Sequence, residues 1–145
     1  MSNPISIDEL KEEFELLGDP ESQMDYLIDL GFELPKLDPS FKTEANRVHG
    51  CQSNVWMVTN YNAEKNQLII EAESDAMIVN GLVCVLLAAY EGASPREILD
   101  FEIAETFKQL GLDRQLSPQR KNGLNGMVQR IRNEAAAMIA KTEAE

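Results

Sequence analysis

The fold is decided by residues 76–90, which read AMIVNGLVCVLLAAY. Apolar side chains occupy almost every position of this stretch, a pattern typical of a helix that is buried on all sides. Asn80 and Gly81 interrupt the apolar run, which is also too short to span a bilayer. We therefore predict a central buried helix, with Ser74 or Asp75 as its N-cap.

Two strand-like segments come directly before this helix. Residues 54–61 alternate between two faces, and residues 67–73 are rich in β-branched side chains. The polar turn 62–66 between them predicts an antiparallel hairpin, and a short strand around residues 47–49 is a candidate third member. Because a hairpin alone is unstable in water, helices must cover one of its faces.

Further helices are indicated by local start signals. The spacing of a capping box, S-x-x-E, occurs at residues 6–9 and again at residues 94–97. An N-cap residue followed by proline occurs at residues 19–20 and 117–118. The predicted helices cover roughly residues 7–17, 20 to the region of Gly31, 95–100, 102–110 and 119–141.

The whole chain, residues 1–145, is expected to form one α+β domain in which helices pack on a small antiparallel β-sheet. Its length is sufficient to bury a proper core. Residues 35–47 contain two prolines and show no clear period, so they are expected to form a loop. Loops of that length are uncommon in compact domains and are often functional or disordered.

The charge of the chain narrows the choice of partners. It carries 25 acidic and 13 basic residues, a net charge of −12, which argues against nucleic acid and anionic membranes. Residues 1–45 hold 12 acidic and 3 basic residues. This acidic excess forms either a solvated surface or a face that docks on a basic partner. The first residues lack the basic and apolar regions of a signal peptide, so a cytoplasmic location is expected.

Cys51 is the candidate for chemistry and lies in residues 48–56, which read VHGCQSNVW. Gly50 before it would let another molecule approach closely, and Gln52 and Ser53 place polar groups beside the sulfur. A thiolate is the reactive form of cysteine and a nearby cation lowers its pKa; His49, the only histidine, is two residues away. These neighbours are compatible with a reactive thiol and equally with a small buried hydrophobe at the start of a strand.

The two cysteines and the histidine allow other chemistry. A cysteine-nucleophile hydrolase would use Cys51 with His49 as its base, although such enzymes usually take the base from a distant segment. The second cysteine, Cys84, lies among apolar residues of the predicted central helix, so we expect an inert, buried thiol. With two thiols and one histidine, a zinc or iron–sulfur site would need added carboxylates, and no bound metal is expected.

The sequence resembles the SufE/CsdE family of sulfur acceptors over about residues 24–138. The resemblance is carried by motifs in the same order and spacing as in the family. They are YLIDLG at 26–31, GCQS at 50–53 followed by Val55-Trp56, SDA at 74–76, and LSP at 116–118 followed by Arg120. The resemblance implies an α+β fold similar to that of the NifU/IscU scaffolds, in agreement with the predicted elements.

The resemblance also implies a function. Cys51 would accept persulfide sulfur, by transpersulfidation, from a cysteine desulfurase of the SufS or CsdA kind and would stimulate that enzyme. The sulfur would then pass to an iron–sulfur cluster assembly scaffold of the SufBCD type or to another acceptor. No cofactor is expected on this chain, because pyridoxal phosphate belongs to the desulfurase. His49 departs from the family pattern, in which proline or a polar residue is frequent, so no family role is assigned to it.

Two residues outside the cysteine segment are further candidates. Arg120 falls at the third position of the last predicted helix, where a cation is unfavourable to the helix dipole and therefore indicates an anionic neighbour. The resemblance implies that this part of the chain lies near the cysteine segment, and the alternative is an ordinary surface arginine. The resemblance, through its SDA motif, also makes Asp75 a candidate. The alternative role of Asp75 is that of an N-cap.

Overall fold

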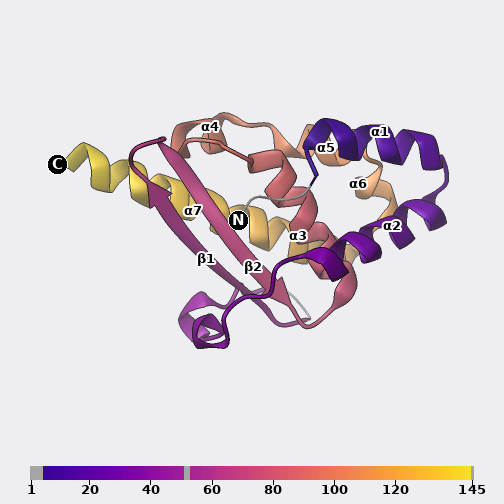
Figure 1. Cartoon of the computed structure of the whole chain (residues 1–145), viewed down its shortest axis with the longest axis horizontal. Coiled ribbons are helices and arrows are strands. Elements are labelled where there is room, and N and C mark those ends of the chain that lie inside the picture. Colours follow the sequence, from indigo (N-terminus) through magenta and orange to yellow (C-terminus); the bar gives the residue numbers. More distant parts are fainter. Residues whose placement is uncertain (1–4, 51–52, 145) are drawn as a thin grey trace.

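The computed structural model describes residues 5–50 and 53–144 and confirms the predicted α+β class (Figure 1). The strands in the described residues are β1 (Val55–Asn62) and β2 (Gln67–Ser74). The helices are α1 (Ile7–Leu17), α2 (Pro20–Glu33), α3 (Met77–Tyr90), α4 (Pro95–Asp100), α5 (Ile103–Gln109), α6 (Leu112–Gln115) and α7 (Pro118–Ala144). Two 3-10 turns, η1 (Pro39–Phe41) and η2 (Glu44–Asn46), lie between α2 and β1.

The hairpin has one buried and one exposed face. β1 and β2 pair antiparallel along their whole length, so the predicted strands are confirmed to within one residue at each end. Side chains alternate between the faces of a strand, and Met57 and Leu68 are therefore buried whereas Ile69 is exposed. Figure 1 shows the hairpin lying across the helices, with α3 packed on β2 and α7 packed on β1.

The candidate third strand around residues 47–49 is reduced to a single bridge. Arg47 lies opposite Trp56 in antiparallel geometry, and the Val48 N–H donates to the Val55 carbonyl oxygen at 2.8 Å. No longer ladder forms in the described residues, because the chain leaves β1 again at Gly50. Residues 47 and 48 therefore lie beside the start of β1 without forming a strand of their own.

The predicted loop at residues 35–47 is fastened to β2. The Glu73 carboxylate accepts the Leu37 N–H at 2.7 Å and pairs with the Lys42 ammonium at 3.3 Å. The same ammonium lies 5.4 Å from the ring centre of Trp56, a distance at which a cation is attracted to the aromatic face. These contacts and the turns η1 and η2 give the loop a defined path along the hairpin.

The helices α2 and α3 touch backbone to backbone. A Cβ atom at Gly81 would overlap the Leu27 carbonyl group, and one at Gly31 would lie 2.5 Å from the Met77 carbonyl oxygen. Gly31 does lie in the last turn of α2, as predicted, but the helix continues to Glu33. The lack of a side chain at Gly31 therefore permits the contact with α3 and does not mark the end of the helix.

The start of α3 differs from the prediction. Its N-cap is Ala76, whose side chain cannot accept a hydrogen bond. Ser74 Oγ accepts the Ala76 N–H at 3.1 Å, and the Asn80 side chain bonds both backbone groups of Ser74. The prediction that Ser74 or Asp75 is the N-cap is wrong, because the Asp75 carboxylate is bonded to Asn54 instead.

The C-terminal helices follow their capping signals. Ser94 and Glu97 form the predicted capping box of α4. Ser117 Oγ accepts the Arg120 N–H at 3.3 Å, which confirms the predicted start of α7. The short helix α6 was not predicted, since four residues are too few to show a helical period.

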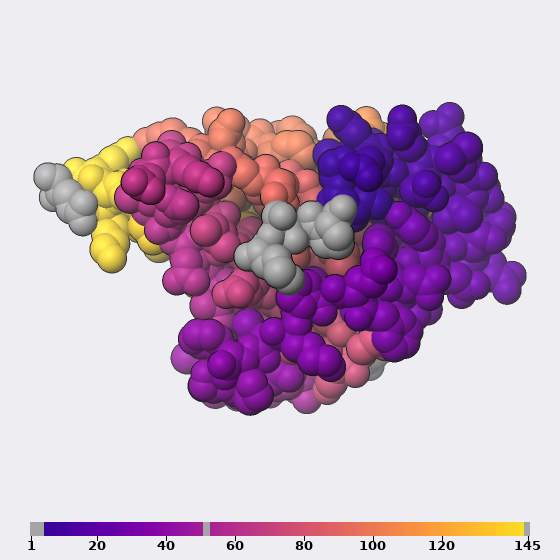
Figure 2. Space-filling model, viewed as in Figure 1, coloured from indigo at the N-terminus to yellow at the C-terminus, as the bar shows by residue number. Residues whose placement is uncertain are grey.

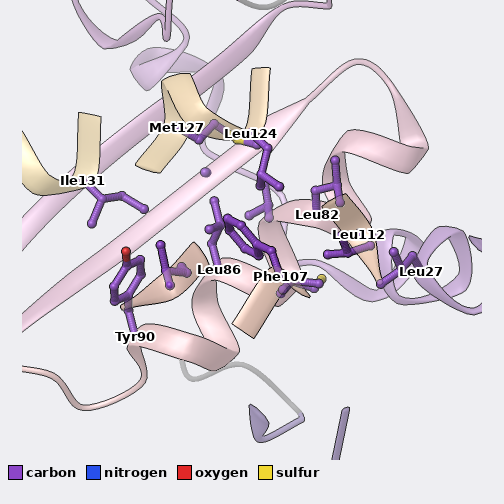
Figure 3. Close-up of a cluster of buried hydrophobic side chains, with 14 of the residues drawn as sticks. Leu27, Leu82, Leu86, Tyr90, Phe107, Leu112, Leu124, Met127 and Ile131 are labelled. Carbon is purple, nitrogen blue, oxygen red and sulfur yellow. The ribbon is translucent and has the colours of Figure 1, made fainter. Parts of the chain in front are cut away.

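A hydrophobic core lies where α2, α3, α5, α6 and α7 meet, as Figure 3 shows. Most of the apolar side chains of α3 are buried, in agreement with the prediction of a central buried helix. The labelled members of the cluster are Leu27, Leu82, Leu86, Tyr90, Phe107, Leu112, Leu124, Met127 and Ile131.

The N-terminal helices α1 and α2 lie together at one end of the molecule (Figure 2). Because residues 7–33, which contain these two helices, hold 10 acidic residues and 1 basic residue, the excess negative charge of the chain is concentrated at this end. Docking of a basic partner on it stays a prediction. In the part of the chain that the structure describes, no helix is both long and apolar enough to cross a membrane.

Candidate functional site

The cysteine segment is described on both sides of Cys51, while Cys51 and Gln52 themselves lie outside the described residues. Gly50 has a φ angle of +93°, in the region that favours glycine. Apart from its chain neighbours, no described residue lies within 4 Å of the position that a Cβ atom would take there. The backbone before Cys51 is thus exposed and adopts a conformation that a larger residue would strain.

A pocket of about 160 Å³ opens beside this segment. Ser53, two residues after Cys51, lines it together with Arg120 at the start of α7. The predicted proximity of Arg120 to the cysteine segment is therefore observed, although its role is not tested. Residues from α3 and α7 complete the walls, and the lining consists of Ser53, Val79, Leu82, Ser117, Gln119, Arg120, Gly123, Leu124 and Met127.

Asp75 holds the chain just after Ser53. Its carboxylate accepts the Asn54 backbone N–H at 3.2 Å and the Asn54 Nδ2–H at 3.0 Å. The Asn54 carbonyl oxygen in turn accepts bonds from the Ser74 hydroxyl at 2.7 Å and the Asp75 N–H at 3.3 Å. Asn54, which sequence reasoning did not single out, is thus the residue through which the corner between β2 and α3 fixes the downstream side of the segment.

His49 lies on the upstream side and points into solvent. Its side chain is 72% exposed, and its Nε2 atom lies 3.3 Å from the carboxylate of Glu44, which is equally exposed. Arg47 approaches the same carboxylate at 3.8 Å. The imidazole is therefore engaged with a neighbouring acid of η2, and its relation to the Cys51 thiol lies outside the described residues.

Cys84 occupies the predicted buried position. Only 1% of the residue is exposed, and its Sγ donates to the Leu30 carbonyl oxygen at 3.4 Å. Burial, with a smaller contribution from the negative charge of Glu33, raises the pKa of the Cys84 thiol to about 11. A thiol with such a pKa is almost entirely protonated near neutral pH and is a poor nucleophile.

The described residues contain no cluster of three or more histidine, cysteine, aspartate or glutamate side chains that could hold a metal ion. The chemistry available around the pocket is instead that of two serines, a glutamine, an arginine and apolar side chains next to the cysteine segment. An arginine near a thiol favours its anionic form, because the positive charge lowers the pKa of the thiol. The fold and the site thus define a small α+β protein with a pocket between α3 and α7 that is lined in part by Ser53, two residues after Cys51 in the sequence.

The chain belongs to the SufE family. Residues 8–135 match the family model described as the SufE Fe-S metabolism associated domain. An uncharacterized SufE-like protein of Rhizobium etli is 42% identical over 137 residues, which cover 93% of each chain. Another from Rhizobium meliloti is 41% identical over 136 residues, 92% of this chain and 97% of that protein.

The fold also has a counterpart among solved structures. The solution structure of a hypothetical protein from Thermus thermophilus superposes with a TM-score of 0.71, covering 97% of this chain and 99% of that chain. The two sequences are 22% identical, so this likeness concerns the fold alone. It agrees with the predicted arrangement of helices on a small antiparallel sheet.

Proposed function

We propose that the protein is a sulfur carrier that accepts persulfide sulfur on Cys51 from a cysteine desulfurase of the SufS or CsdA kind. It stimulates the desulfurase and passes the sulfur to an iron–sulfur scaffold of the SufBCD type or to another acceptor in the cytoplasm. The observation that carries this proposal is the SufE family match over residues 8–135, which includes Cys51.

The transfer is an exchange between sulfur atoms. The Cys51 thiolate attacks the outer sulfur of the persulfide on the desulfurase, a new S–S bond forms, and the S–S bond on the donor breaks. The donor cysteine leaves as a thiolate, so no external oxidant or reductant is consumed. Pyridoxal phosphate acts on the desulfurase, and in this proposal the carrier itself needs no cofactor.

The pocket between α3 and α7 supports the proposal. The apolar part of its wall, including Leu82 and Met127, would shelter one side of a bound sulfur from water. Arg120 on the same pocket would stabilise the negative charge of a thiolate or persulfide. Gly50, Gln52 and Ser53 would give the segment its backbone freedom and polar groups.

Asp75 has a supporting role in this proposal. Because its carboxylate bonds Asn54, it holds the chain on which Ser53 faces the pocket. His49 is not needed for the transfer, and the described residues offer no observation in favour of a hydrolase that uses it as a base. Its imidazole is exposed and paired with Glu44.

The test is to incubate the protein with a SufS-type desulfurase and cysteine and to locate added sulfur by peptide mass spectrometry. We expect the mass of one or more sulfur atoms on Cys51 and none on Cys84. Cys51→Ser should abolish acceptance while leaving the fold intact, whereas Cys84→Ala should retain acceptance. Sulfur found only on Cys84, or on neither cysteine, would contradict the proposal.

A further inference from the structure

The chain directly upstream of Cys51 lies on the surface of α7. A Cβ atom at Gly126 would lie 3.1 Å from the His49 carbonyl oxygen and 3.9 Å from Cγ1 of Val48. Val48 is buried, and its N–H is bonded to the Val55 carbonyl oxygen at 2.8 Å. The missing side chain at position 126 thus lets the backbone of residues 48–49 rest directly on the helix.

Arg130, one turn further along α7, holds the same segment through its guanidinium group. Its Nη1 donates to the Arg47 carbonyl oxygen at 3.3 Å, and its Nη2 donates to the Ala45 carbonyl oxygen at 3.1 Å. Its Nε donates to Glu134 at 3.2 Å, and Glu134 accepts a further bond from the Thr59 hydroxyl of β1. All three guanidinium nitrogens are therefore used, and two of them hold the segment.

Partial burial, the positive charge and the shape of the guanidinium group strengthen these hydrogen bonds. The Arg130 side chain is only 25% exposed, so its bonds are partly shielded from competing water. Hydrogen bonds from a charged donor are stronger than those between neutral groups. The rigid fork of arginine can engage two carbonyl groups at once, which the single ammonium of lysine cannot do with the same geometry.

We propose that Arg130 is a positioning residue for sulfur transfer, which sets the placement of Cys51 by holding residues 45–49 on α7. Gly126 permits the close approach that this anchor requires. The proposal rests on the proposed function, because the placement of Cys51 matters for sulfur transfer only if Cys51 carries the sulfur. Arg130 acts through the segment and is not itself assigned a contact with a reacting atom.

Arg132 provides a matched control on the same helix. It is also partly buried, and its Nη1 donates to the Leu99 carbonyl oxygen of α4 at 2.9 Å, outside the cysteine segment. Arg130→Gln and Arg132→Gln therefore remove the same charge and the same kind of bond to a backbone carbonyl group. Arg130→Gln alone loses the bonds that hold residues 45–49, together with the ion pair to Glu134.

The decisive measurement is the rate at which sulfur moves from a SufS-type desulfurase to Cys51 at saturating carrier. We expect Arg130→Gln to lower this rate about tenfold, the factor given by loss of roughly one charge-assisted hydrogen bond. Arg130→Lys should fall between Arg130→Gln and the wild type, and the half-saturating carrier concentration should not change. Hydrogen exchange at the Val48 amide should accelerate in Arg130→Gln, while Arg132→Gln should transfer sulfur at the wild-type rate.

Equal transfer rates for the wild type and Arg130→Gln would overturn the proposal, as would equal slowing in Arg132→Gln. If Arg130→Gln does not fold, Gly126→Ala replaces it, since alanine favours the helix while crowding the His49 carbonyl group. That variant should fold and slow the transfer, and a wild-type rate would count against the anchor. A wild-type protein that accepts no sulfur would refute the proposed function instead, and exchange at Val48 would still test the anchor.

Discussion

Alkaline solution is expected to destabilise the protein through Cys84. The thiol is buried in α3, and burial, with a smaller contribution from Glu33, raises its pKa from an ordinary 9.0 to about 11. Between these values the unfolded chain ionises the thiol while the folded chain keeps it protonated. The stabilisation from this difference is therefore fully present below about pH 9 and is lost as the pH rises through about 11.

The size of the effect follows from the two pKa values. A difference of about two units corresponds to about 3 kcal/mol in the free energy of unfolding. Roughly half of this amount is lost by about pH 10, one unit above the pKa of the unfolded chain. Removing the thiol in Cys84→Ala should abolish this part of the pH dependence.

Urea unfolding of the wild type, Cys84→Ala and Cys51→Ser at about pH 8 and pH 10 measures the effect. At about pH 8, Cys84→Ala should be less stable than the wild type by about 1–2 kcal/mol, because it leaves a small cavity. At about pH 10 this gap should narrow by about 1 kcal/mol. Cys51→Ser retains the Cys84 thiol and should show the same narrowing against Cys84→Ala. A gap of the same size at both pH values would refute the inference that burial keeps Cys84 protonated.

Two further predictions concern the site and the core. Charge reversal in Asp75→Lys or Arg120→Glu should change desulfurase stimulation by about two- to fivefold, a typical effect of one surface charge, without unfolding the protein. Unchanged stimulation and affinity in both variants would mean that neither residue contributes to desulfurase binding. Gly81→Ala should lower the free energy of unfolding by about 2 kcal/mol, because overlap with the Leu27 carbonyl group outweighs the gain of about 1 kcal/mol in helix propensity. Urea titration measures the second effect, and an unchanged or higher midpoint would contradict the backbone contact between α2 and α3.

The helices that sequence reasoning located correctly begin at signals contained within a few residues. Ser94 and Glu97 cap α4 by bonding each other, so their spacing alone was sufficient to predict the helix start. Asp75 shows the limit of this reasoning. Its carboxylate is bonded to Asn54, 21 residues earlier in the chain, and a local signal could not distinguish that partner from the first turn of α3. A nonlocal partner thus displaced a plausible cap.

The candidate site also combines features that the local sequence predicts with contacts that it does not predict. The burial of Cys84 follows from its immediate sequence surroundings and was predicted. Glycine at position 50 permits the positive φ angle that is observed there, but the sequence did not predict that angle. The nearness of Arg120 to Ser53 depends on how α7 packs beside α3, and only the family resemblance indicated it. The contacts of Arg130 were missed, because arginine on a long polar helix is usually a surface residue. A signal was present one turn earlier, since a glycine inside a helix often marks a close approach of another backbone.

The positions of the pocket and of the cysteine segment depend on the same two helices. The upstream side of the segment is held on α7 through Arg130, and the downstream side is held at the entry to α3 through Asp75. Leu82 of α3 and Met127 of α7 also line the pocket and belong to the buried core. A shift of one helix against the other would therefore alter the pocket and the separation of the two anchors together. Close packing resists such shifts. This is a physical reason why α3, the most apolar helix of the described chain, forms part of the pocket wall.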